Sequence, residues 1–363
     1  MQIKLQGKCG VVGENRMEKI KLTDICNPKQ WKTIPTSELL ENGYPVYGAN
    51  GIIGYYSEFN HKNPVITVTC RGATCGTINI TVPKSYVTGN AMCLDDMRSD
   101  IYMEYLYYCL KHYNFNNVIS GSAQPQITRQ GMEKIYVTIG SHNEQMDIVD
   151  KLKKVENVIG LRKRELKQLD TLVKSRFAEM FGDPIRNPKG WKVVTIGDIV
   201  TEVRYGTSKP AVEGGKYPYL RMNNLTADGH LDLNDLKYID ISDDEVEKCV
   251  VRKGDVLFNR TNSIDLVGKT AVFDLQDDMV IAGYIIRVRL NEKILPEVLS
   301  QYMNLEALKD ILRSMAKGAV NQANINAQEL QSIRVYVPDI ELQKQFVEMK
   351  DQVDKSKSKI QKS

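Results

Sequence analysis

One stretch of this chain, residues 143–181, constrains the fold more than any other. It contains a single glycine, Gly160, and no proline, so nothing in it forces a helix to end. Its apolar residues recur at steps of four and three, a period typical of a helix that packs lengthwise against another helix. At a rise of ~1.5 Å per residue, this predicts a helix roughly 60 Å long. The apolar positions are Ile148, Leu152, Val155, Ile159, Leu166, Leu169, Val173 and Met180, with Arg162 and Arg176 interrupting them.

The sequence before this stretch returns after it. Leu22-Thr23-Asp24-Ile25 recurs as Ile196-Gly197-Asp198-Ile199, and Tyr44-Pro45 recurs as Tyr217-Pro218. Later residues match at a constant shift of 198 positions, among them Ile127 with Ile325, Met132 with Leu330, Ile135 with Ile333, Val137 with Val335 and Gln145 with Gln343. Self-similarity of this kind indicates two copies of one structural unit. It also predicts a second helix that begins near residue 340 and whose polar last residues are frayed.

The predicted fold class is α+β, with two similar mixed α/β domains separated by an antiparallel pair of long helices, a coiled coil. Strands are expected at 64–69, 76–82 and 135–139 and a helix at 102–112, from their β-branched and amphipathic patterns. The repeat predicts near-twofold internal symmetry. We place the boundaries at an N-terminal tail 1–16, a first domain 17–141, a central helix 142–182, a second domain 183–339 and a C-terminal helix 340–363.

Composition limits the class of protein. The chain has 363 residues, of which 42% are hydrophobic and 26% charged, as in soluble globular proteins. No apolar run is long enough to span a bilayer and no signal peptide precedes the first domain, so we expect a cytoplasmic protein without membrane contact. The net charge of +4 permits a nucleic-acid partner if the basic residues cluster, but does not establish one.

The sequence offers little that is typical of an enzyme. Its seven cysteines lack metal-ligand spacing and no histidine pair lies close to them, so we expect reduced, buried thiols and no metal site. Glycine-rich cofactor loops and P-loops are missing. No Asn-Pro pair is followed by the second proline and aromatic residue that an amino-methyltransferase needs. We therefore expect no catalytic residues in this chain.

Two adjoining segments carry a family resemblance. Residues 171–184 (TLVKSRFAEMFGDP), followed by 187–191 (NPKGW), closely resemble the central conserved region of the specificity subunit of type I restriction–modification systems. Residues 256–260 with 267–270, and residues 122–127, are similar to further family loops. The resemblance covers about residues 17–363. The N-terminal segment has no place in the family pattern, and the second helix is shorter than the first.

The resemblance implies a non-catalytic subunit that recognises double-stranded DNA with two target-recognition domains. It implies two modification methyltransferase subunits as partners, and restriction motor subunits in some complexes. No cofactor is expected in this chain; the methyltransferase would use S-adenosylmethionine, and the restriction subunit ATP and Mg. The alternatives are a coiled-coil interaction scaffold without DNA binding, and the detached recognition half of a fused restriction–modification enzyme.

Residues suited to DNA contact occur at matching places in the two halves. Phosphates are contacted by Lys, Arg and backbone N–H groups, and base edges by Arg, Asn and Gln. Each of these residues also has a structural explanation: an arginine can pair with a carboxylate at a strand end, and amides form turns or bond to loop backbone. The candidates are Tyr47, Asn50, Arg71, Gly72 and Gln124 in the first half, and Arg204, Tyr205, Lys209, Arg221, Asn223, Asn224, Arg260, Thr261, Asn262 and Gln322 in the second.

The loops after the two matching strands differ in sequence, TCRGATCG at 69–76 and FNRTNSID at 258–265. Different loops are expected to contact different bases. The sequence therefore predicts an asymmetric target made of two half-sites with an unread spacer between them. It does not give the bases of either half-site or the length of the spacer.

Overall fold

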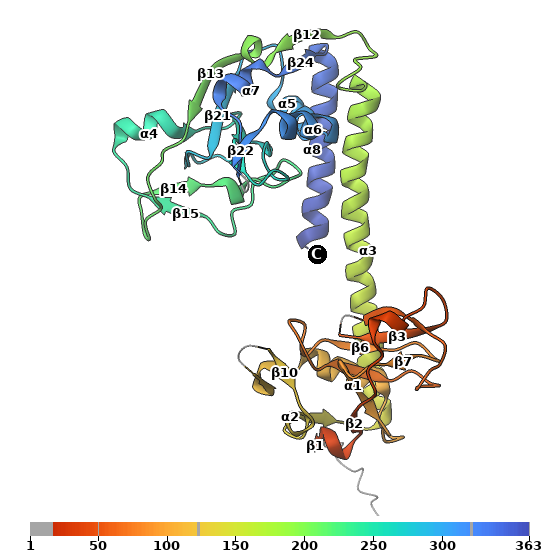
Figure 1. Ribbon diagram of the computed structural model, residues 1–363. Helices are drawn as coiled ribbons and strands as arrows, with labels where there is room; N and C mark the ends of the chain where they lie inside the picture. Colours follow the sequence, from red (N-terminus) through yellow and green to blue (C-terminus); the bar gives the residue numbers. More distant parts are fainter. Residues whose placement is uncertain (1–16, 50, 122–123, 320–321, 363) are drawn as a thin grey trace, which may run out of the picture. The chain divides into compact units, whose positions relative to one another are not determined.

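The computed structural model describes residues 17–362 except 50, 122–123 and 320–321, and it divides into two compact units, residues 1–160 and 161–363 (Figure 1). The expected tail, residues 1–16, lies outside the described residues. The predicted long helix is α3 (His142–Phe181), which has 40 residues and passes from unit 1 into unit 2. Among the described residues, no helix combines the length and the apolar character needed to cross a bilayer.

Unit 1 is built on an antiparallel sheet with the strand order β2-β8-β5-β6. A second sheet, β4-β3-β7, contains one parallel pair, and two short ladders join β1 to β11 and β9 to β10. The strands are β1 (Glu18–Lys21), β2 (Asn27–Gln30), β3 (Tyr44–Gly48), β4 (Gly51–Tyr56), β5 (Ile66–Thr69), β6 (Ile78–Ile80), β7 (Tyr86–Val87), β8 (Ala91–Asp95), β9 (Ile119–Ser120), β10 (Gln126–Ile127) and β11 (Tyr136–Ile139).

The core of unit 1 lies between the main sheet and its helices. All four residues of β5 are buried, which explains the continuous β-branched run of that strand. The helix α1 contributes Tyr105, Leu106 and Leu110 to the same core, as its amphipathic pattern predicted. The other helices of unit 1 are short: η1 (Leu22–Asp24), η2 (Thr36–Glu38), η3 (Phe115–Asn117) and α2 (Arg129–Met132), beside α1 (Met103–His112).

Unit 2 contains the same kinds of sheet. Its strand orders are β13-β21-β17-β19, β15-β14-β20-β16, β18-β23-β22 and β12-β24. The strands are β12 (Lys192–Thr195), β13 (Val200–Tyr205), β14 (Tyr217–Leu220), β15 (Lys237–Ile239), β16 (Val250–Val251), β17 (Val256–Asn259), β18 (Thr261–Asn262), β19 (Thr270–Val272), β20 (Met279–Ile281), β21 (Ile285–Leu290), β22 (Lys317–Ala319), β23 (Gln322–Asn324) and β24 (Arg334–Val337). The helices are η4 (Ile196–Ile199), η5 (Met222–Asn224), α4 (Asp243–Cys249), α5 (Pro296–Met303), α6 (Glu306–Met315), α7 (Ala327–Ser332) and α8 (Ile340–Lys362).

The predicted repeat is confirmed down to single hydrogen bonds. In each unit a central strand, β5 or β17, lies antiparallel between two strands of the main sheet. Gln145 and Gln343, matched from the sequence alone, are both buried on a long helix and make equivalent bonds. Gln145 accepts from the Tyr102 backbone N–H at 2.7 Å, and Gln343 accepts from the Leu295 backbone N–H at 2.8 Å. Each also donates to two carbonyl oxygens in its own unit.

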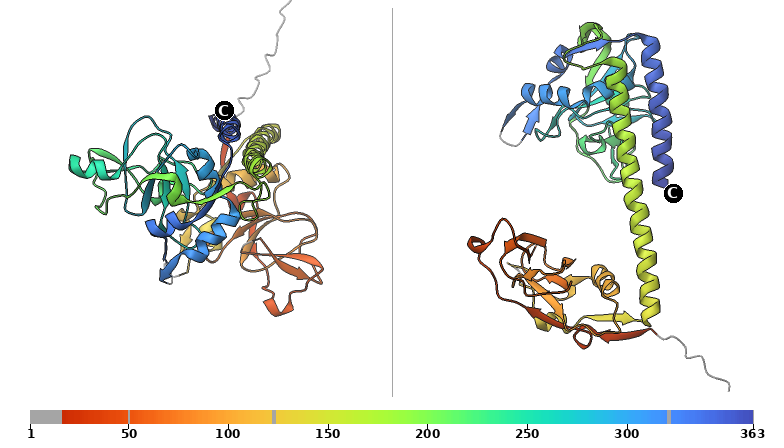
Figure 2. Two further views of the ribbon diagram at one scale, coloured as in Figure 1. Left: turned by 90° about the horizontal axis from the view of Figure 1, so that it is seen from above. Right: turned by 90° about the vertical axis from the view of Figure 1, so that its right-hand side faces the viewer.

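Within unit 2, α8 lies antiparallel against the second part of α3 (Figures 1 and 2). Phe346, near the start of α8, packs against Phe177 near the end of α3, with ring centroids 5.2 Å apart. At the other end of α8 the carbonyl oxygen of Ile360 accepts a hydrogen bond from Arg162 Nη1 at 3.2 Å. The helix α8 continues to Lys362, so the expectation that its last residues are frayed is wrong. The bond to Arg162 gives the physical reason.

The predicted apolar seam of α3 is covered over only part of its length. Val173 is buried in the core of unit 2, and Leu169 and Met180 pack against that core. Every residue from 151 to 159 is exposed instead, including Leu152, Val155 and Ile159. The periodic pattern therefore predicted the helix correctly, and α8 covers the part of the seam that lies in unit 2.

Candidate nucleic-acid interface

A groove in unit 2 brings together four of the residues predicted to contact DNA. It has a volume of about 560 Å³ and is lined by the segment after β13, the ends of β14 and β17, and the turn after β20. Three cationic side chains and one amide on this surface were expected from the sequence: Lys209, Arg221, Arg260 and Asn223. The remaining lining residues are Thr207, Ser208, Pro210, Ala211, Tyr219, Met222, Ala282, Gly283 and Tyr284.

Among the described cations of the groove, Arg260 is the one without a carboxylate partner. It follows β17 directly, and its backbone N–H donates to Tyr284 while its carbonyl oxygen accepts from Ile325. The guanidinium carbon lies 4.9 Å from the centre of the Tyr205 ring, and Nη1 donates to Gly283 O at 3.4 Å. In the part of the chain that the structure describes, no carboxylate pairs with it and its Nε has no hydrogen-bond partner. Its backbone is fixed and its charge remains available to an anion.

The other basic side chains near this groove are balanced by carboxylates. Lys209 Nζ lies 2.5 Å from Glu245 and Arg221 Nη2 lies 2.8 Å from Asp235. Arg204, beside the groove on β13, pairs with Glu202 at 3.0 Å. These pairs are at least partly exposed, and exposed pairs contribute about 0–1 kcal/mol, so a phosphate could replace the carboxylate at small cost.

Buried side chains make hydrogen bonds that fix the loop that carries Asn223. Lys269 is 8% exposed, and its Nζ donates to the carbonyl oxygens of Met222, at 2.8 Å, and Leu225. Burial lowers the pKa of Lys269. Asn224 is buried as well, accepting from the Arg221 backbone N–H and donating to Asp232 O. Asn223 is left exposed at the surface of this anchored turn.

Sequence reasoning missed the part played by Lys269. The segment 267–270 was noted only as similar to a family loop, and a Gly-Lys-Thr triplet gives no sign of what its lysine contacts. The contact lies 47 positions back along the chain, at Met222. Only the three-dimensional arrangement reveals this support of the Asn223 loop.

Three further predicted residues make hydrogen bonds within the protein next to the groove. Thr261 is buried in β18 and donates to Asn324 on β23 at 2.9 Å. Asn262 is half-buried and accepts the Ser263 backbone N–H at 2.9 Å. Tyr205 is 43% exposed, and its hydroxyl accepts from the Ala327 backbone N–H. The side chain of Gln322 lies outside what the structure describes.

In unit 1, Arg71 and Gln124 are exposed and lie near each other along the backbone ladder. Arg71 forms an isolated antiparallel bridge with Gln126, and the Gly72 N–H donates to Pro125 O at 3.1 Å. Gly72 has φ +90°, a conformation that side chains rarely adopt, which fits its place in a tight turn. Asn50 lies outside the described residues.

Tyr47 differs from what the sequence comparison indicated. It is 6% exposed, and its hydroxyl accepts from the Val82 backbone N–H at 3.2 Å. The strand registers explain the difference. In unit 1, Tyr47 on β3 pairs with Val87 on the parallel strand β7, and in unit 2, Leu220 on β14 pairs with Ile281 on the parallel strand β20. Leu220 is a core residue, so Tyr47 matches it and not Arg221, whose counterpart is Gly48. The polar groups of Tyr47 and Asn224 make hydrogen bonds inside their own units. We therefore do not include these two residues in the proposed DNA contacts.

Two copies of one mixed α/β domain, each ending in a long helix, define a two-domain internal-repeat protein. A family model, described as the type I restriction modification DNA specificity domain, matches residues 14–171 and again residues 188–363. The chain therefore belongs to this family of type I specificity subunits.

Relatives and solved structures agree with the family. The chain is 30% identical over 171 residues to the putative MjaX specificity subunit of Methanocaldococcus jannaschii, and 24% identical over 273 residues to the EcoKI specificity subunit of Escherichia coli. The first match covers 46% of this chain and 40% of the relative, and the second covers 70% of this chain and 59% of the relative. The chain therefore spans less than two thirds of each relative. The fold is similar to the S subunit from M. genitalium, with a TM-score of 0.59 at 14% identity, covering 99% of this chain and 94% of that one.

Proposed function

We propose that this chain is the DNA sequence-recognition subunit of a type I restriction–modification complex, and that the groove of unit 2 contacts one half of a bipartite site. Family membership supports the class of function, and the groove supports the place of contact. The observation that carries the proposal is Arg260, a cation on a fixed backbone with no carboxylate partner among the described residues. A DNA phosphate supplies the anion that this guanidinium lacks.

The test is the salt dependence of DNA binding. We expect the full chain to bind a labelled mixed-sequence duplex in fluorescence anisotropy, with affinity falling steeply as salt rises. Arg260→Ala removes one phosphate contact, so affinity falls by about 1.5–3 kcal/mol, the range for a hydrogen bond to a charged group. The loss should be similar for every sequence, and the salt slope should decrease by about one. Replacing Lys209 with alanine should have a smaller effect, because its ammonium must first leave Glu245.

Arg252→Ala is the matched control. Arg252 is also an exposed arginine of unit 2, but it pairs with Asp278 and Glu247 and does not line the groove. Its loss should leave binding and salt slope unchanged. Equal losses in both variants, or none in Arg260→Ala, would contradict the assignment of the groove. A wild-type chain that binds no duplex at low salt would favour the scaffold alternative.

The same proposal includes partner subunits. Two modification methyltransferase subunits, carrying S-adenosylmethionine, would assemble on this chain, and restriction subunits using ATP and Mg would follow where they exist. The support on this chain is the uncovered strip of α3 formed by Leu152, Val155 and Ile159, because contiguous exposed apolar side chains mark protein contacts. We further propose that α3 and α8 act as the spacer that sets the distance between the two half-sites.

A further inference from the structure

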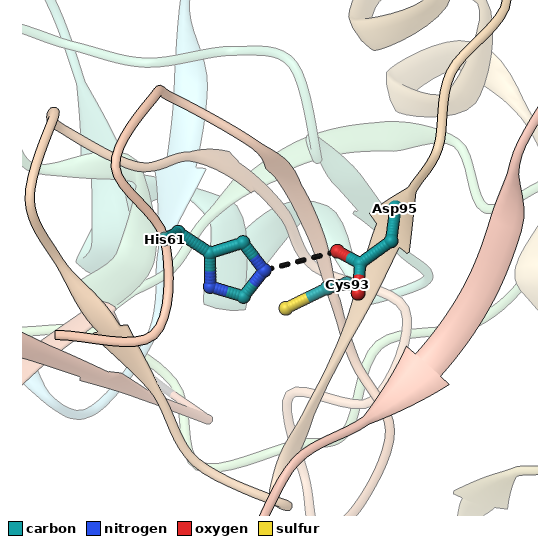
Figure 3. A group of neighbouring side chains, drawn as sticks. All are labelled: His61, Cys93 and Asp95. Atoms are coloured by element: carbon teal, nitrogen blue, oxygen red, sulfur yellow. Dashed lines mark hydrogen bonds and ion pairs between the residues drawn. The ribbon is translucent and has the colours of Figure 1, made fainter.

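In unit 1, three side chains with metal-binding atoms converge beside the main sheet. Cys93 and Asp95 stand on the same face of β8, two residues apart, and His61 reaches them from the loop before β5 (Figure 3). One ligand atom from each lies within 4.8 Å of the other two. Cys93 is fully buried, and the side chains of His61 and Asp95 are 11% and 12% exposed.

Both ring nitrogens of His61 face an oxygen atom. Asn60 is oriented by the Val87 backbone, because its Nδ2 donates to Val87 O and its Oδ1 accepts from Val87 N–H. That same Oδ1 lies 2.6 Å from His61 Nδ1, so Nδ1 must carry a hydrogen and donate. Nε2 lies 2.9 Å from Asp95 Oδ1, a second acceptor. Either a hydrogen or a metal ion must stand between Nε2 and this oxygen.

The surroundings have the features of a metal site. A ligating histidine usually donates its other ring N–H to an oxygen, as His61 does to Asn60. Trp31 Nε1 donates to Asp95 Oδ2 at 3.0 Å, and its ring meets the His61 ring edge-on, with centroids 5.2 Å apart. The backbone of His61 is paired with Ser85. The ligands are therefore held in place by groups that are themselves fixed.

We propose that His61 Nε2, Cys93 Sγ and Asp95 Oδ1 form a zinc site in unit 1, with water as the fourth ligand. A nitrogen, a sulfur and a carboxylate oxygen are a donor set that suits zinc. Bonds of about 2.0–2.3 Å at tetrahedral angles place ligand atoms roughly 3.3–3.7 Å apart. Nε2 and Oδ1, which are 2.9 Å apart without the ion, must therefore separate slightly, and ligand atoms as much as 4.8 Å apart must approach one another. The water enters from the open pocket lined by Asn60, His61 and Asp95.

The experiment uses the full chain after chelator treatment and desalting. Titration with Zn²⁺ against a chromophoric chelator should show one equivalent bound, and Zn²⁺ should raise the Tm of unit 1. Co²⁺ in its place should give the thiolate-to-metal absorption band of a tetrahedral site. Cys93→Ser and His61→Gln should each remove the stoichiometric binding and the Tm shift. Cys26→Ser is the control, because Cys26 is another buried thiol of unit 1 that lies in a different apolar cluster from Cys93, and it should keep both.

Less than stoichiometric zinc in the wild-type chain would overturn the proposal and leave an ion pair between His61 and Asp95. Unchanged zinc binding in Cys93→Ser would overturn it as well. The cobalt spectrum needs no variant, so a variant that fails to fold still leaves a decisive result: a spectrum without the thiolate band excludes Cys93 as a ligand. The outcome is independent of DNA binding by unit 2.

Discussion

At the scale of single residues, His230 joins a loop of unit 2 to α8. Its Nδ1 lies 3.3 Å from Asp228 and its Nε2 3.5 Å from Asp354, whose carboxylate also pairs with Lys350. The nearby carboxylates, Asp228 with the larger effect and Asp354 with the smaller, favour the charged ring and raise the pKa of His230 to about 9. The value in an unfolded chain is about 6.5. The charged ring therefore stabilises unit 2 fully below about pH 6.5, and this stabilisation is lost as the pH rises through about 9.

We expect His230→Gln to lower the free energy of unfolding of unit 2 by about 1 kcal/mol at pH 6, and to have no effect at pH 10. The magnitude is modest because the side chain is 39% exposed and solvent screens the pairs. Urea unfolding followed by fluorescence measures it, in a Trp31→Phe background where Trp191 reports on unit 2. His112→Gln, an exposed histidine, is the control. An equal loss at both pH values would contradict the assignment.

Residue types alone could not show which of the predicted residues line a surface groove and which are bonded within the fold. Arg260, Asn223 and Lys209 were predicted because loops of the second half carry basic and amide groups, and the structure places all three on one groove. Tyr47 was misjudged because a shift of one position in a strand exchanges a core residue for a loop residue. The cluster of His61 with Cys93 was invisible to spacing rules, since its ligands come from separate segments.

At the scale of elements, the ends of the long helices belong to the core of a domain. Phe177 and Phe181 on α3 and Phe346 on α8 are all fully buried and form edge-to-face pairs with one another. Sequence periodicity predicted both helices and their contact, because a 3.5-residue repeat depends only on local spacing. It could not show that 151–159 stay exposed, since coverage depends on where the partner helix ends.

This aromatic cluster gives a prediction about stability. Phe346→Ala should lower the free energy of unfolding of unit 2 by about 3–5 kcal/mol, since it leaves a cavity between two buried rings. Urea unfolding followed by Trp191 fluorescence measures this loss of stability. Phe59→Ala removes a ring that is 38% exposed in unit 1 and should leave the Trp191 transition where it is. A loss below about 1 kcal/mol for Phe346→Ala would mean that α8 is not part of this core.

At the scale of the whole molecule, two copies of one fold present different side chains at equivalent places. In the first copy, Arg71 forms a backbone bridge with Gln126. At the equivalent positions of the second copy, Thr261 pairs with Asn324. The position of Gly48 in the first copy is that of Arg221 in the second. Duplication fixes the framework, and these substitutions give each copy its own chemistry at the surface. Under the proposed function, the two half-sites of the DNA target must therefore differ.

Methylation mapping tests this asymmetry. Cells that express the chain with its methyltransferase partner should carry methylated adenines within two unlike short half-sites, separated by a spacer of fixed length and any sequence. Arg221→Ala should relax or change the half-site contacted by unit 2 and leave the other unaltered, because the two copies contact DNA separately. Arg252→Ala should leave both unchanged. A palindromic or continuous motif, or a change in both half-sites from Arg221→Ala, would contradict recognition by two independent domains.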